Sequence, residues 1–184
     1  FSGDIGSPNR PILNDPVQVY EVDYLIVEST YGDRLHGDSQ SAREHDLARV
    51  INDNITRGGI LVIPAFAVGR TQELLYHIRE LENRGAVPPL PIYIDSPMAI
   101  NATAITAKMQ NDYDLQARML MLDGQEILKP ANLHIARSVK ESKALHAVKG
   151  PAIFISASGM LEGGRILHHL QERLPKAENT VLFV

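Results

Sequence analysis

Short β-branched runs alternate with longer amphipathic segments along this chain, and this alternation restricts the fold more than any other feature. Short apolar runs predict strands at residues 24–28, 60–64, 91–95, 132–136, 152–156 and 180–184. Apolar residues spaced three and four apart predict helices at 39–56, 70–83, 97–110, 114–122, 138–148 and 164–174. Because parallel strands need a crossover between them, we expect an α/β fold with a mostly parallel sheet flanked by helices on both faces.

The composition is that of an ordinary globular protein. Of 184 residues, 44% are hydrophobic and 22% charged, which suits one or two compact domains rather than a disordered chain. The apolar runs are too short to span a bilayer, so no membrane association is predicted. The absence of cysteine excludes disulfides and thiolate metal sites from this sequence. These features favour a cytoplasmic protein.

The net charge of −4 bears on possible partners. A strong non-specific nucleic-acid binder normally carries a basic surface, and this composition argues against one. It remains compatible with an enzyme that binds nucleic acid locally, through a small basic cleft.

Polar residues follow several of the predicted strands. In an open parallel sheet ligands bind at the carboxyl ends of the strands, and the polar residues expected there are Glu28, Asp95, Ser96, Ser156 and Ser158. The stretches 64–70 and 159–165 each join a strand to a helix, where backbone N–H groups and the helix dipole favour phosphate. Arg70 and Arg165 can add bidentate contacts to phosphate oxygens.

Each of these residues can also serve the fold alone. A Ser or Asp after a strand is most often a helix N-cap, and spacing alone favours that interpretation. Gly163 and Gly164 can simply permit a tight turn, and Arg70 can pair with Glu73 three residues later.

The seven histidines contain no local zinc motif. Neither a His-x-His nor a His-Glu-x-x-His sequence occurs, so nearby residues alone build no zinc site. His168 and His169 are adjacent on a predicted helix and point about 100° apart. At most one of them can therefore face an active site.

Five segments, in order and over essentially the whole chain, resemble one family. They are residues 1–6 (FSGDIG), 27–33 (VESTYGD), 64–73 (PAFAVGRTQE), 93–99 (YIDSPMA) and 156–170 (SASGMLEGGRILHHL). This pattern is similar to the β-CASP branch of the metallo-β-lactamase superfamily, which contains RNA-processing nucleases, and the last segment looks most like its prokaryotic members.

The resemblance implies roles for particular residues. Asp4 would be the carboxylate that bridges two zinc ions, which generate a hydroxide and stabilise an in-line phosphoryl displacement. Glu28 would support the site through a hydrogen bond to a histidine. The candidates for contact with RNA or phosphate are then Arg70, Ser158, Gly159, Arg165 and His169.

Several family motifs are absent from the sequence. It contains no His-x-His-x-Asp-His run, and the histidines of the second and third β-CASP motifs are missing too. We therefore expect this chain to be part of a longer protein, with residues 1–30 from the metallo-β-lactamase domain and 31–184 as a β-CASP domain incomplete at its C-terminus. Since Asp4 is its only expected metal ligand, the chain alone should hold no stable zinc and be inactive.

The function predicted for the parent protein is that of a zinc-dependent ribonuclease. The resemblance implies hydrolysis of single-stranded RNA by an endonuclease, with 5′-exonuclease activity and a homodimer left open. Two alternatives stay within the family: a non-catalytic RNA-binding or scaffold subunit, and a nuclease that acts on DNA. An unrelated Rossmann-like protein is disfavoured because no Gly-x-Gly-x-x-Gly follows the first strand.

Overall fold

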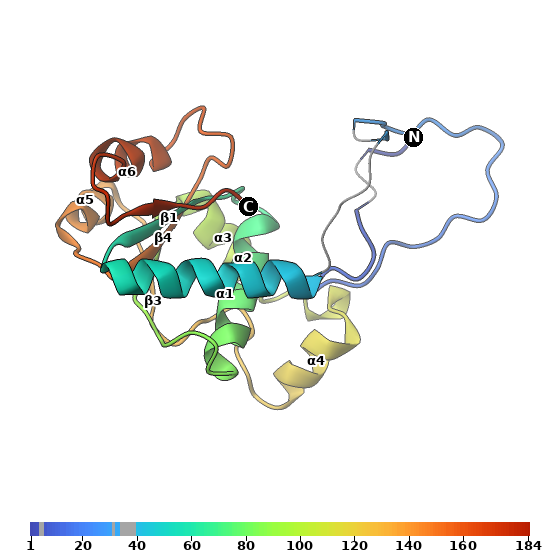
Figure 1. Cartoon of the computed structure of the whole chain (residues 1–184). Coiled ribbons are helices and arrows are strands. Elements are labelled where there is room, and N and C mark those ends of the chain that lie inside the picture. The colour runs from blue at the N-terminus through green and yellow to red at the C-terminus, as the bar shows by residue number, and fades with distance from the viewer. Residues whose placement is uncertain (4–5, 31, 34–39) are drawn as a thin grey trace.

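A single parallel sheet organises the chain. The computed structural model describes residues 1–3, 6–30, 32–33 and 40–184. Within them, five strands form one sheet in the order β3-β2-β4-β1-β5, with every pairing parallel (Figure 1). The strands are β1 (Ile60–Pro64), β2 (Ile92–Ile94), β3 (Leu133–Ile135), β4 (Ala152–Ser156) and β5 (Thr180–Val181).

Helices cover both faces of this sheet. Helices α1 (Gln40–Arg57), α2 (Arg70–Asn83) and α3 (Pro97–Thr106) pack on one face, and α5 (Val139–Ala144) and α6 (Ile166–Arg173) lie on the other. Outside these layers, α4 (Leu115–Leu122) joins a smaller apolar cluster with Ile12 and Tyr76. The predicted α/β class is confirmed. None of the described helices has the length and apolar character needed to cross a membrane.

The central strands are apolar because both of their faces are covered. All residues of β1 and β4 are buried. Leu61 and Ile63 contact the core on the α1–α2 side, whereas Val62 and Phe154 contact the core beneath α6. Continuous rather than alternating hydrophobic runs are the usual signature of such doubly covered parallel strands.

Two predicted helices are shorter than their sequence patterns. The helix predicted over 97–110 ends at Thr106 and is followed by a 3₁₀ turn, η1 (Gln110–Asp112). The helix predicted over 138–148 ends at Ala144 and continues as a second turn, η2 (Leu145–Ala147). Its predicted capping box is confirmed: Ser138 Oγ accepts from Glu141 N at 3.2 Å, and the Glu141 carboxylate accepts from Ser138 N at 2.7 Å.

The buried strand predicted over residues 24–28 is wrong. Tyr24 is 93% exposed and Ile26 57%, and the described residues give this run only an isolated bridge between Ser2 and Val27. In Figure 1 the surrounding stretch loops away from the layered body. An apolar run favours an extended backbone, but burial needs neighbouring strands and a covering layer, which the run cannot supply itself.

A matched pair of isoleucines tests this difference in the 184-residue chain. Ile63 is fully buried in β1, so Ile63→Ser should lower the free energy of unfolding by about 3–5 kcal/mol through lost packing and a buried hydroxyl. Ile26→Ser should stay within about 0.5 kcal/mol, as surface substitutions do. Urea denaturation measures both; a large loss for Ile26→Ser would restore the buried-strand interpretation.

Candidate functional site

A buried carboxylate lies at the carboxyl edge of the sheet, directly after β2. Asp95 has no exposed surface, and its side chain accepts hydrogen bonds from three others. Arg165 Nη1 lies 2.7 Å from Oδ1, while Ser142 Oγ and His169 Nε2 lie 2.6 Å and 2.7 Å from Oδ2. We call Asp95, Ser142, Arg165 and His169 the Asp95 cluster. It brings α5 and α6 together at the end of β2.

Backbone contacts extend the Asp95 cluster to the neighbouring strands. Ser156 Oγ, at the end of β4, donates to the Asp95 carbonyl at 2.7 Å. The Arg165 guanidinium also donates to the carbonyls of Ala136 at 2.9 Å and Arg137 at 3.0 Å, just beyond β3. One cluster therefore connects the carboxyl ends of three strands.

The electrostatics of the Asp95 cluster favour the ionised carboxylate. Burial by itself raises the pKa of Asp95, but hydrogen bonds from His169, Ser142 and Arg165 outweigh it and hold that pKa below its usual value. His169 is fully buried, and within the described chain its Nδ1 has no hydrogen-bond partner. In this arrangement Nε2 can donate its hydrogen to the Asp95 carboxylate.

Two predicted RNA-contacting residues belong to this cluster. Arg165 is 19% exposed and directs its guanidinium to Asp95 and two carbonyls, and His169 has no exposed surface. RNA lying on the surface would not reach the His169 ring in this arrangement. His168 is exposed whereas His169 is buried, so the two adjacent rings point in different directions, as their helical spacing predicts.

The loop at residues 157–164 carries two further predicted contacts, Ser158 and Gly159. Ser158 N donates to Gly163 O at 3.4 Å, which closes the loop on itself. Gly164 has φ +83°, and a Cβ there would lie 2.6 Å from Ala157 O, so the turn requires glycine. Within the described chain, the N–H groups of Gly159, Gly163 and Gly164 donate to no acceptor. The loop can therefore offer backbone donors to an anion.

An exposed aromatic ring lies against this loop. Phe66, which follows β1, is 55% exposed. A Cβ built on Gly159 would lie 3.2 Å from the Phe66 ring, so a larger residue there would require the ring or the loop to move by a few tenths of an ångström. Met160 in the loop is also exposed, at 62%. The edge of the sheet thus presents exposed apolar side chains near backbone donors.

The loop before α2 is less suited to phosphate than its sequence suggests. Gly69 N donates to the Gln72 side chain at 2.7 Å, and Thr71 N donates to Phe66 O at 3.2 Å. These N–H groups are therefore already satisfied. Arg70 Nη1 lies 2.9 Å from Glu73 Oε2, which is the intrahelical pair that its spacing permits, and the Arg70 side chain is 36% exposed.

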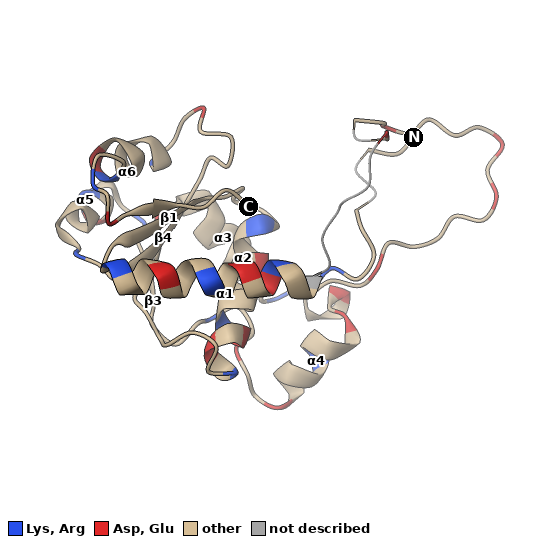
Figure 2. Ribbon diagram, in the orientation of Figure 1, with Lys and Arg blue, Asp and Glu red and all other residues tan. Residues whose placement is uncertain are grey.

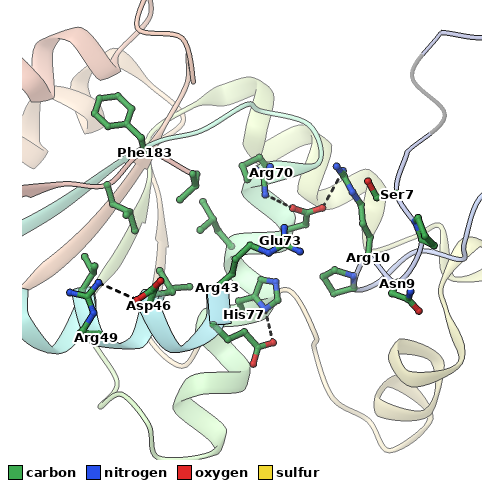
Figure 3. A pocket seen from close by; sticks show the side chains of 18 residues that line it. Ser7, Asn9, Arg10, Arg43, Asp46, Arg49, Arg70, Glu73, His77 and Phe183 are labelled. Atoms are coloured by element: carbon green, nitrogen blue, oxygen red, sulfur yellow. Dashed lines mark hydrogen bonds and ion pairs between the residues drawn. The ribbon is translucent and has the colours of Figure 1, made fainter. Parts of the chain in front are cut away.

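Charges of both signs are interspersed on the surface. Figure 2 shows basic and acidic residues alternating along α1, where Arg49 pairs with Asp46 at 3.1 Å. A cavity of about 630 Å³ lies between α1, α2 and the end of the chain (Figure 3). Its apolar wall includes Leu182 and Phe183. Its charged lining mixes four arginines with three carboxylates: Arg10, Arg43, Arg49, Arg70, Glu44, Asp46 and Glu73. The lining of the cavity therefore has no strong excess of positive or negative charge.

Only one of the two residues expected near the zinc ions can be located. Asp4 lies outside the described residues, so its bridging role stays a prediction. Glu28 is exposed, and its carboxylate accepts from Thr30 N at 2.8 Å, which lowers the pKa of Glu28. Hydrogen bonds from Ser2 N to Ile26 O and from Glu28 N to Ser2 O place these two motif segments side by side.

The described part of the chain does not fit a zinc site by itself. It contains no group of three or more His, Asp or Glu side chains able to hold a metal ion. Structural zinc sites need four ligands and catalytic ones usually three from the protein. A dizinc centre would therefore need residues beyond those described.

This architecture is a three-layer α/β domain with its polar groups at the carboxyl edge of a parallel sheet. The profile of the Beta-Casp domain matches residues 71–184, and the chain belongs to this family.

Curated relatives match the chain over nearly its whole length. A ribonuclease of Thermus thermophilus is 36% identical over 100% of the chain and 42% of its own length. Transcription termination factor FttA of Methanosarcina mazei is 33% identical over 100% of the chain and 29% of its own. An RNase J-like protein of Methanocaldococcus jannaschii is 33% identical over 93% and 39%. The chain thus spans less than half the length of each.

Sequence reasoning placed Asp95 at a strand end but did not select it as a site residue, and it missed Ser142. One signal pointed to Asp95: Arg165 and His169 are four apart at the start of a helix, so both project from one face. Two donors on one face can share an acceptor, although the spacing does not say which residue that is. No comparable signal marks Ser142, because its partner lies 47 positions away in the sequence.

The Asp95 cluster predicts a stability that falls at low pH. Asp95→Asn should lower the free energy of unfolding at pH 7 by about 3–5 kcal/mol, because it breaks a buried ion pair. The folded pKa lies below the unfolded value of about 3.9, so the carboxylate's contribution is complete above pH ~4 and disappears as pH falls through the folded pKa. Urea denaturation at several pH values should show the difference between variant and wild type shrinking below pH ~4.

An exposed aspartate provides the control for this measurement. Asp53 on α1 is 59% exposed, and Asp53→Asn should change stability by less than about 0.5 kcal/mol at any pH. Equal effects of the two substitutions would rule out a dominant role for the buried cluster.

Proposed function

We propose that this chain is the β-CASP part of a zinc-dependent ribonuclease that hydrolyses phosphodiester bonds of single-stranded RNA. The supporting observation is its 36% identity, over 100% of its length, to a protein named as a ribonuclease. In this proposal residues 31–184 form the β-CASP domain, and residues 1–30 belong to the nuclease domain that carries the metal ions.

The carboxyl edge of the sheet is the proposed RNA-binding surface. Phosphate groups suit the backbone donors of the loop at 157–164, and the exposed Phe66 ring suits stacking with a base. Arg70, partly exposed at the start of α2, adds a cation. The interspersed surface charges and the net charge of −4 agree with binding confined to this edge.

Zinc, when bound, would supply the hydroxide and the stabilisation of the transferred phosphoryl group. Asp4 is the one residue of this chain proposed to ligate it. The 184-residue chain alone is therefore expected to bind no zinc stably and to cut no RNA, while still contributing the RNA-binding surface.

The decisive test compares the complete protein with its Asp4→Ala variant. With zinc present, the wild type should cleave a labelled single-stranded RNA. Asp4→Ala should lose bound zinc and lower the cleavage rate by more than about 100-fold, since even indirect partners of metal ligands cost 10–100-fold. Metal analysis, gel-based cleavage and circular dichroism measure metal content, activity and folding.

Asp23→Ala is the control, because Asp23 is an exposed carboxylate outside the motif segments, and it should behave as wild type. A wild type that binds RNA but holds no zinc and cuts nothing would support the scaffold alternative. Cleavage of single-stranded DNA in preference to RNA would support the DNA-directed alternative.

The stacking role of Phe66 is tested separately. Phe66→Ala should weaken RNA binding by about 1–3 kcal/mol, the usual value of one base–aromatic stack. Fluorescence anisotropy with a labelled single-stranded RNA, in EDTA to prevent zinc-dependent cutting, measures the Kd. Leu122→Ala on α4 removes a side chain that is 86% exposed and should leave the Kd unchanged. Equal Kd values for all three proteins would exclude stacking on Phe66.

A further inference from the structure

We propose that Arg165 and His169 do not touch RNA but act through Asp95, as positioning residues that hold the loop at 157–164 in its binding conformation. This inference rests on the proposed function, because it assigns these residues a role in RNA binding. It differs from the expectation from sequence, in which both side chains contact phosphate directly.

The contacts of Arg165 all point into the fold. Its guanidinium donates to the Asp95 carboxylate at 2.7 Å and to the carbonyls of Ala136 and Arg137 at 2.9 Å and 3.0 Å. These three acceptors lie at the ends of two different strands, and together they define one position for the planar guanidinium group. Because Arg165 directly follows Gly164, this position also fixes the C-terminal end of the loop.

His169 can act on the surface only through a neighbour. Its ring has no exposed area, and it packs edge-on against Phe154 with centroids 5.1 Å apart. Nε2 is bound to Asp95, and Nδ1 has no hydrogen-bond partner in the described chain. Its only polar contact there is therefore with the carboxylate that also holds Arg165.

The N-terminal end of the loop is also hydrogen-bonded to Asp95, through its backbone carbonyl. Ser156 Oγ donates to the Asp95 carbonyl at 2.7 Å, and Ile166 N donates to Ala157 O at 3.4 Å. Both ends of the loop thus contact Asp95 or a residue bound to it, whereas the N–H groups of Gly159, Gly163 and Gly164 have no acceptor within the described chain. Loss of one partner leaves buried polar groups unpaired, and the loop ends must shift to satisfy them.

Direct phosphate contact, a purely stabilising role and positioning differ in what they predict for RNA binding. If Arg165 contacts phosphate, removing its charge must reduce the salt dependence of binding, by about 0.7 in the slope of log Kd against log salt for a single strand. If the Asp95 cluster only stabilises the fold, variants that are fully folded must bind RNA as wild type does. Positioning predicts weaker binding by folded protein with an unchanged slope.

The experiment uses the complete protein in EDTA and anisotropy with a 5′-labelled single-stranded RNA. Measurements run at several KCl concentrations and at a temperature where circular dichroism shows each variant folded. Arg165→Met and His169→Leu should each raise the Kd about tenfold without changing the salt slope. His169→Gln should restore binding to within about twofold, because its amide can donate to Asp95 as Nε2 does.

A glycine in the loop and a glycine outside it provide a matched pair of variants that leave the side chains of the Asp95 cluster unchanged. Gly164→Ala places a Cβ 2.6 Å from Ala157 O and should raise the Kd about as much as His169→Leu. Gly124→Ala has a similar backbone penalty at φ +77° but lies after α4, with no atom within 4 Å of the new Cβ. It should cost stability without changing the Kd.

Each result has one meaning. A slope reduced by about 0.7 in Arg165→Met would establish direct phosphate contact and overturn the inference. If folded Arg165→Met and His169→Leu bind RNA with the wild-type Kd, the Asp95 cluster only stabilises the fold, and the inference is also overturned. Failure of the wild type to bind RNA would overturn the proposed function, and this inference with it.

Discussion

The buried carboxylate of Asp95 is the constraint on which the carboxyl edge of this sheet depends. A carboxylate without exposed surface is tolerated only when donors surround it, and Ser142, Arg165 and His169 supply them. Those donors come from α5 and α6, so satisfying one charge also determines where both helices begin relative to β2. The same interactions also determine the position of the loop between β4 and α6.

This arrangement separates the residues that hold the surface from those that can meet a ligand. The polar side chains with the most informative sequence spacing, Arg165 and His169, face inward. The groups left available at the same edge are backbone N–H groups and the exposed Phe66 ring. A sequence pattern does not reveal them, because every residue but proline has an N–H group and a single phenylalanine is common. The proposed RNA-binding surface needs no basic overall composition, in agreement with the net charge of −4.

Most of the fold was predictable because its determinants are local. Continuous apolar runs in β1 and β4, the apolar face of α2 and the capping box of Ser138 and Glu141 each depend on a few neighbouring residues. Residues 24–28 have an equally strong local pattern, yet they are exposed. Their burial depends on partner strands, and one bridge to Ser2 is what the described residues provide.

The sequence by itself determined the class of fold, the approximate limits of its helices and strands, and the family to which the chain belongs. These follow from periodicity and from motifs that occupy a few consecutive positions. Only the tertiary structure decided that Asp95 is the shared acceptor, that Ser142 joins it, and that His169 is buried. Their partners lie 47, 70 and 74 positions apart in the chain, and the sheet order that brings them together depends on long-range packing that no local pattern encodes.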